Sequence, residues 1–145
     1  AERLNFASSI LKNEGLYIET YANAPISKYE FYDEFGKVNL YMLPYSSPLY
    51  TRVKFDSTCN NYSEMIKYYV ENSNIDFSKR NILLTHHTFL HNNMASFSDS
   101  EVRFNIGGTE GIDAAYFKDF DYVALGHIHN PQYVNRHHIR YSGSI

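Results

Sequence analysis

Seven histidines are unevenly distributed along the 145-residue chain, and three of them could bind a metal ion together. None precedes residue 86. His86 directly follows the apolar run Asn81–Thr85, and His127 and His129 follow a second such run, Tyr122–Leu125. Neutral imidazole is the commonest metal ligand in proteins. Two histidine groups that each follow a short apolar run therefore indicate one shared metal site.

The segment Gly126-His127-Ile128-His129 has the spacing that such a site needs. In an extended backbone, residues i and i+2 point to the same side, so both imidazoles could face one ion or an ion pair. Gly126 permits backbone conformations and close approaches that a side chain would prevent. If the two apolar runs are neighbouring strands of an open α/β sheet, His86 comes beside this pair, because ligands bind at the carboxyl ends of such strands. The predicted metal ligands are His86, His127 and His129, which could also hold one Zn²⁺ with water as the fourth ligand.

Other polar residues lack this combination of spacing and position. Four histidines are interpreted as surface or packing residues: His87, His91, His137 and His138. Four carboxylates in or just after a polar stretch could equally be solvated: Asp99, Glu101, Glu110 and Asp113. The chain has no Gly-rich phosphate loop that ends in Lys-Ser or Lys-Thr and no Gly-X-Ser-X-Gly turn.

The elements that must position the histidines follow from hydrophobic periodicity and turn residues. Helices are predicted over Glu2–Glu14, Tyr62–Glu71 and Ile112–Phe117, and single strands over Leu16–Glu19, Asn81–Thr85 and Tyr122–Leu125. Two hairpins are predicted, one from Tyr29–Tyr32 and Val38–Leu43, the other from Gln132–Asn135 and His138–Ser142 around Arg136-His137. The two strands that precede the histidines are expected to be buried on both faces.

Two stretches are predicted to be irregular. Pro44 and Pro48 are expected to end the second strand of the first hairpin, and the chain from there to Asn60 is expected to be a loop. The polar stretch His91–Gly111 is expected to form a long surface loop, which in a compact domain is more often functional than idle. Together these elements predict the α/β fold class in one domain, residues 1–145.

Composition excludes several classes of protein. The chain has 13 Lys plus Arg and 16 Asp plus Glu, a net charge of −3, which argues against a basic nucleic-acid clamp. At 43% hydrophobic and 20% charged, it can bury an ordinary core. No apolar run approaches the roughly 20 residues that a membrane helix needs. Cys59 is the single cysteine, which fits a reducing cytoplasm and gives no support to a disulfide scaffold.

The motifs around the histidines also resemble a known family. His86, the segment Asp121–Pro131 and the segment Arg140–Ser144 are similar to those of the calcineurin-like metallophosphoesterases. Within that superfamily the long match through Tyr-Ser-Gly-Ser is closest to the SbcD-like, or Mre11-like, nuclease subunits. Leu43-Pro44-Tyr45 and Gly107–Asp113 are also similar to that family.

The resemblance implies a four-layer α-β-β-α sandwich around two divalent metal ions, commonly Mn²⁺, with His86, His127 and His129 among the ligands. The family's first three motifs, Asp-X-His, Gly-Asp and Gly-Asn-His-Asp, have no counterpart here. We therefore expect the chain to be the carboxyl-terminal half of a metallophosphoesterase domain, without the amino-terminal strands and the capping domain, and inactive by itself. The missing strands would leave sheet edges and apolar faces open, so a dimer or a rearranged sheet is expected.

The implied activity is metal-dependent hydrolysis of phosphodiester bonds at DNA ends and hairpins, in the repair of double-strand breaks and in recombination. The implied partners are DNA and an SbcC-like (Rad50-like) coiled-coil ATPase, in a homodimer or heterotetramer without membrane contact. Two alternatives stay open: a metallophosphoesterase that acts on phosphomonoesters or nucleotides, and a non-enzymatic binding module with its histidines at the surface.

Overall fold

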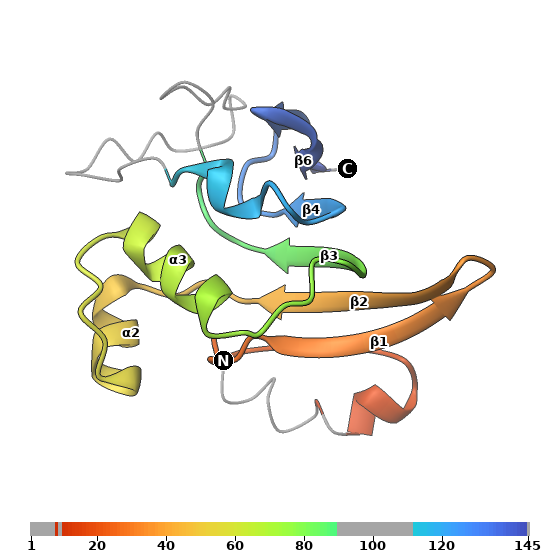
Figure 1. The fold of residues 1–145 in the computed structure, drawn as a ribbon, viewed down its shortest axis with the longest axis horizontal. Coiled ribbons are helices and arrows are strands. Elements are labelled where there is room, and N and C mark those ends of the chain that lie inside the picture. The colour runs from red at the N-terminus through yellow and green to blue at the C-terminus, as the bar shows by residue number, and fades with distance from the viewer. Residues whose placement is uncertain (1–7, 9, 90–111, 145) are drawn as a thin grey trace.

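The computed structural model describes residues 8, 10–89 and 112–144, and these residues form a six-stranded mixed sheet with the strand order β1-β2-β3-β4-β6-β5 (Figure 1). Strands β2, β3, β4 and β6 are parallel, and the edge strands β1 and β5 are antiparallel to their neighbours. The strands are β1 (Ser27–Asp33), β2 (Gly36–Leu43), β3 (Arg80–Thr85), β4 (Tyr122–Leu125), β5 (Gln132–Val134) and β6 (Arg136–Tyr141). The helices with assigned bounds are α2 (Pro48–Phe55), α3 (Tyr62–Glu71) and the 3₁₀ helix η1 (Ala114–Phe117). The α/β prediction is confirmed.

Helix α3 has the predicted bounds, whereas α2 lies where a loop was predicted. Ser47 is extended, and its hydroxyl accepts a hydrogen bond from the Tyr50 N–H at 3.1 Å, as an N-cap residue does. Pro48 occupies the first turn, where a missing N–H has no cost. The prediction that this proline only interrupts structure was therefore wrong, because a proline that follows serine can begin a helix.

Both predicted hairpins form, with shorter turns than expected. Asp33 pairs with Gly36, so two residues connect β1 and β2 where four were predicted. In the second hairpin Asn135, at φ 60°, makes the turn, and Arg136 and His137 belong to β6. Their assignment to the turn was wrong, because asparagine tolerates the left-handed conformation that this turn requires.

The predicted strand Leu16–Glu19 is absent from the structure, which has irregular backbone there. Side-chain contacts hold this segment instead of a strand ladder. The Tyr17 ring lies 4.5 Å from that of Tyr29 in β1, and the Tyr29 hydroxyl donates to the Glu19 carboxylate. Before it, residues 10–13 are helical, and Gly15 follows that helix at φ 78°, the left-handed conformation that commonly ends a helix. The rest of the predicted helix Glu2–Glu14 lies largely outside the described residues.

The two faces of the sheet differ in burial. On one face, Leu83, Val123 and Ile139 are fully buried in a core that also contains the α3 residues Met65 and Ile66. On the other face, Leu84 is 40% exposed and Tyr122 39% exposed. The prediction that β3 and β4 are buried on both faces was therefore wrong, since the described residues cover only one face.

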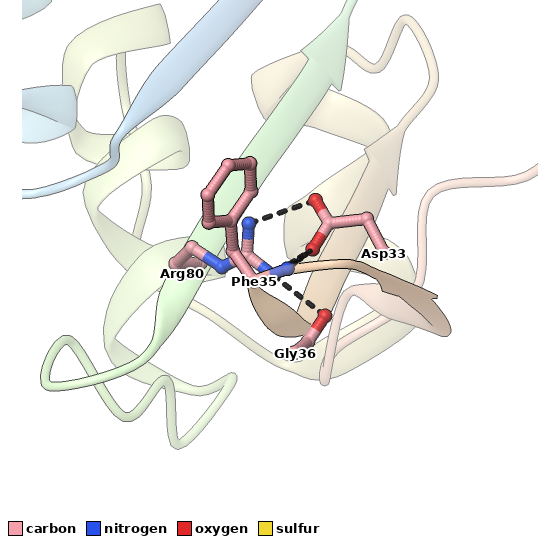
Figure 2. A network of polar contacts seen from close by, with 4 residues as sticks. All are labelled: Asp33, Phe35, Gly36 and Arg80. Carbon is pink, nitrogen blue, oxygen red and sulfur yellow. Dashed lines mark hydrogen bonds and ion pairs between the residues drawn. The ribbon is translucent and has the colours of Figure 1, made fainter.

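The β1–β2 hairpin extends beyond the amino ends of β3 and β4 (Figure 1). A charged network joins the base of its turn to β3, as Figure 2 shows. The Arg80 guanidinium donates to both Asp33 carboxylate oxygens, at 2.8 and 2.7 Å, and to the Gly36 carbonyl at 2.6 Å. All three groups are exposed, so this network fixes the hairpin at the surface. Within the described residues, none of the helices has the length and apolarity to cross a membrane.

Candidate metal centre

The two predicted strand ends are neighbours in the sheet. Strands β3 and β4 pair in parallel with Thr85 opposite Leu125, so His86 and Gly126 are the first residues beyond the ladder on each side. The Gly126 N–H continues the pairing by donating to the Thr85 carbonyl at 2.9 Å. The carboxyl edge of the sheet therefore brings together two segments that lie 40 residues apart in the sequence.

The imidazoles of His86 and His127 lie side by side, with ring centroids 5.4 Å apart and an angle of 81° between the ring planes. Both side chains are exposed to solvent. His129 is exposed as well, whereas Ile128 between them is buried, so His127 and His129 both belong to the solvent side. The backbone is not the extended one assumed from the spacing, because His127 has a φ of 97°. Non-glycine residues with positive φ are uncommon, and strained residues cluster at functional sites.

Gly126 is required sterically by the position of His86. A Cβ atom at residue 126 would lie 2.6 Å from His86 Nδ1, closer than real side-chain contacts. Any other residue here would displace the ring. The glycine of the Gly-His-X-His segment therefore leaves room for the imidazole that comes from the neighbouring strand.

The electrostatics favour neutral nitrogen donors. Removal of part of the ring from water lowers the pKa of His86, and the neighbouring His127 and His129 lower it further. A lowered pKa leaves the imidazole neutral at physiological pH, which is the form that binds metal ions. The influence of His129 also indicates that the third predicted ligand lies within electrostatic range of the first.

The neighbouring imidazoles of His86 and His127 have the donor chemistry that suits a divalent transition metal. In the part of the chain that the structure describes, there is no group of three or more His, Cys, Asp or Glu side chains placed to hold a metal ion. The assignment of His86, His127 and His129 as joint ligands therefore remains a prediction, with His86 and His127 as its neighbouring pair.

The other sequence candidates occupy varied places. His87 is buried, with only 2% of its surface exposed, as a packing residue would be, and burial lowers its pKa to about 4. His137 is exposed and lies 4.6 Å from the Tyr133 ring, and His138 is half-buried. Asp113 accepts a hydrogen bond from the Ala115 N–H at 2.8 Å and so caps η1. Four candidates lie outside the described residues: His91, Asp99, Glu101 and Glu110.

Sequence reasoning missed the role of the final segment. Ser144 N–H donates to the His129 carbonyl at 3.0 Å, which joins the end of the described chain to the histidine segment. Gly143 has φ 79°, and a Cβ there would lie 2.8 Å from Pro131 Cδ and 2.9 Å from the His129 carbonyl oxygen. In the sequence, only the family resemblance points to the Tyr-Ser-Gly-Ser motif, although a glycine after a strand is itself a signal for such a close approach.

Comparisons with known proteins concern the chain as a whole. No protein-family model matches the chain. The chain is 35% identical over 147 aligned positions to the curated SbcD subunit of the nuclease SbcCD from Staphylococcus epidermidis. That alignment covers 99% of this chain and 37% of the relative. The chain is therefore similar to just over a third of an SbcD-type nuclease subunit, and the similarity extends through both histidine segments.

Proposed function

We propose that this chain forms part of the catalytic centre of an SbcD-like nuclease of the calcineurin-like metallophosphoesterase superfamily. The observation that carries the proposal is the pair His86 and His127, whose rings are neighbours at the ends of two parallel strands. The similarity to the SbcD subunit of an SbcCD nuclease supports DNA as the substrate and an SbcC-like ATPase as the partner. The four-layer sandwich and a pair of Mn²⁺ ions belong to the same proposal.

In this proposal, each residue of the centre has a separate task. His86 and His127 supply neutral nitrogen donors, and His129 supplies a third from the same side of the chain. Gly126 leaves room for the His86 ring. The Ser144 N–H holds the backbone of His129 by donating to the His129 carbonyl. A bound pair of divalent ions would supply an activated water and stabilise charge on the phosphodiester.

The direct test replaces one proposed metal donor in the full-length natural protein that contains this sequence. His127→Ala should lower Mn²⁺-dependent cleavage of linear duplex DNA by more than about 100-fold, since even residues outside the ligand shell contribute 10–100-fold. His137→Ala, at an exposed histidine of β6, is the matched control and should leave cleavage unchanged. Equal cleavage by the His127→Ala variant and the unmodified protein would refute the proposal.

Two further assays separate the alternatives. A small phosphate ester such as p-nitrophenyl phosphate, compared with DNA ends and hairpins, distinguishes a phosphomonoesterase from a nuclease. Because the family's Asp-X-His, Gly-Asp and Gly-Asn-His-Asp motifs have no counterpart in this sequence, the 145-residue chain by itself should show no cleavage above its own His127→Ala variant. Robust turnover by the chain alone would contradict the incomplete site.

A further inference from the structure

His87 is a histidine that the proposed metal centre does not use, yet it is held more firmly than its neighbour. Its ring is 2% exposed and lies stacked on Tyr45, with centroids 5.4 Å apart and an interplanar angle of 26°. The Ser46 N–H donates to its Nε2 at 3.1 Å, and its Nδ1 lies 2.9 Å from Thr85 Oγ1. The ring therefore joins the end of β3 to the loop that follows β2.

Either neutral tautomer satisfies both ring nitrogens, because Nε2 also lies 3.3 Å from the Ser46 carbonyl oxygen, to which it could donate while Nδ1 accepts from the Thr85 hydroxyl. If Nε2 instead accepts the Ser46 N–H, the proton of the neutral ring is on Nδ1, and Nδ1 donates to the Thr85 hydroxyl. In both forms the ring nitrogens have partners while the ring is buried, and only one orientation of the ring satisfies them. A buried polar side chain with a single satisfied orientation fixes the backbone that carries it.

The backbone is fixed on both sides of His86. On one side the Thr85 carbonyl accepts from the Gly126 N–H at 2.9 Å. On the other side the Tyr141 hydroxyl of β6 donates to the His87 carbonyl at 3.0 Å and accepts from the Phe89 N–H at 2.7 Å. His86 itself is the exposed residue between these fixed points, and its ring lies over Gly126.

We infer that His87 is a positioning residue, whose buried imidazole between Ser46 and Thr85 fixes His86 over Gly126 and beside His127. The inference deepens the proposed function, since it rests on His86 as a metal donor. The alternation of β3 explains the geometry, because consecutive residues at a strand end point to opposite sides. Because the His87 side chain is held in the core, the His86 side chain points to solvent.

The test compares variants of the full chain in which the hydrogen bonds of the His87 ring are removed one at a time or together. His87→Phe keeps an aromatic ring against Tyr45 and removes both ring hydrogen bonds, whereas His87→Gln restores an acceptor for the Ser46 N–H. Thr85→Val and Thr85→Ser remove and keep the other partner. Val123→Ala, in the buried part of β4, is a control for general loss of stability, and His137→Phe repeats the same substitution at an exposed site.

Two measurements report on His86. In the metal-free chain, nuclear Overhauser contacts between the His86 ring and the Gly126 α-protons should disappear in His87→Phe and persist in Val123→Ala. With Zn²⁺ as the probe, His87→Phe should bind about tenfold or more weakly, as is typical when a residue that orients a ligand is lost. His87→Gln should recover part of that affinity, and Thr85→Val should lose more than Thr85→Ser.

The outcomes separate this inference from the proposed function. The inference is overturned if His87→Phe keeps both the proton contacts and the Zn²⁺ affinity, or if Val123→Ala loses as much of both. If His86→Ala binds Zn²⁺ as tightly as the unmodified chain, the proposed metal site fails. The proton contacts in the metal-free chain then still decide whether His87 positions His86.

Discussion

The two ends of strand β3 both carry polar side chains, and they are held in different ways. At the carboxyl end, His87 and Tyr141 are buried and make hydrogen bonds with backbone groups. At the amino end, Arg80 and Asp33 form an exposed ion pair at the base of a hairpin (Figure 2). Buried hydrogen bonds are expensive to break because one partner is left without water, whereas exposed ion pairs exchange readily with solvent. The rigid end of the strand is therefore the end that carries His86.

The largest effect is expected from Gly126→Ala at the carboxyl end. A Cβ 2.6 Å from His86 Nδ1 must displace the ring, so Zn²⁺ affinity should fall by at least about tenfold, as for other losses of ligand orientation. The free energy of unfolding should change less than it does on overpacking a core, because the His86 ring is exposed and can move aside. Zinc titration and urea unfolding measure the two effects.

Gly36→Ala is the matched control at the amino end. Nothing lies within 4 Å of a Cβ there, but its φ of 104° strains any L-residue. It should lower the free energy of unfolding by about 1–3 kcal/mol while leaving Zn²⁺ affinity unchanged. A loss of Zn²⁺ affinity equal to that of Gly126→Ala would show that the two ends of the sheet are not independent.

The next effect concerns the buried tyrosine of β6. Tyr141→Phe leaves the buried Phe89 N–H without its acceptor at 2.7 Å. The free energy of unfolding should decrease by about 1–3 kcal/mol, the usual cost of an unsatisfied buried group. Urea unfolding measures it, with Tyr32→Phe at the 74%-exposed ring of the hairpin as the control. An equal change in both variants would contradict the contrast between the buried and exposed groups.

A smaller effect is expected from Arg80→Ala. The guanidinium and the Asp33 carboxylate are exposed, so their separation should change stability less than Tyr141→Phe does. The coupling between Arg80→Ala and Asp33→Ala in a double-mutant cycle should shrink as salt is added, because salt screens exposed charges. A coupling that is independent of salt would indicate that the pair is effectively buried.

The smallest effect is the pH dependence of the same pair. Hydrogen bonding to Arg80 lowers the pKa of Asp33 below its ordinary value. A carboxyl group with a lowered folded-state pKa stabilises the protein above its unfolded-state pKa of about 3.9, and this stabilisation is lost as the pH falls through the folded-state value. Unfolding curves of the unmodified chain and Asp33→Asn should therefore converge in acid. Curves that stay parallel down to the lowest measurable pH would contradict this.

Local sequence signals predicted the elements with clear periodicity or unbroken apolar runs. The bounds of α3 and β4 match their predictions, because Met65, Ile66 and Tyr69 share one helix face and Tyr122–Leu125 is uninterrupted. Helix α2 was missed because a proline can either interrupt a regular element or occupy the first turn of a helix. At Pro48, only the preceding Ser47, the N-cap, distinguishes the two. The segment Leu16–Glu19 has the sequence pattern of a strand, but contacts with side chains of β1 hold it, and a local pattern cannot show such contacts.

The candidate site could be predicted as far as the neighbouring strand ends. His86 and His127 each follow an apolar strand, and because the two strands pair in parallel, the two histidines lie close together. The contacts of His87 depend on Ser46, which is 41 residues away and belongs to a loop of no regular pattern. Partners of that kind follow from the tertiary fold and have no local signal.

The unusual backbone at His127 has a consequence for the stability of this centre. A φ of 97° costs a non-glycine residue about 1–3 kcal/mol, and glycine would adopt it freely. His127→Gly should therefore raise the urea midpoint of the chain while removing a nitrogen donor. If His127 is a metal donor, as proposed, this centre gives up some durability of the fold in exchange for the direction of one imidazole.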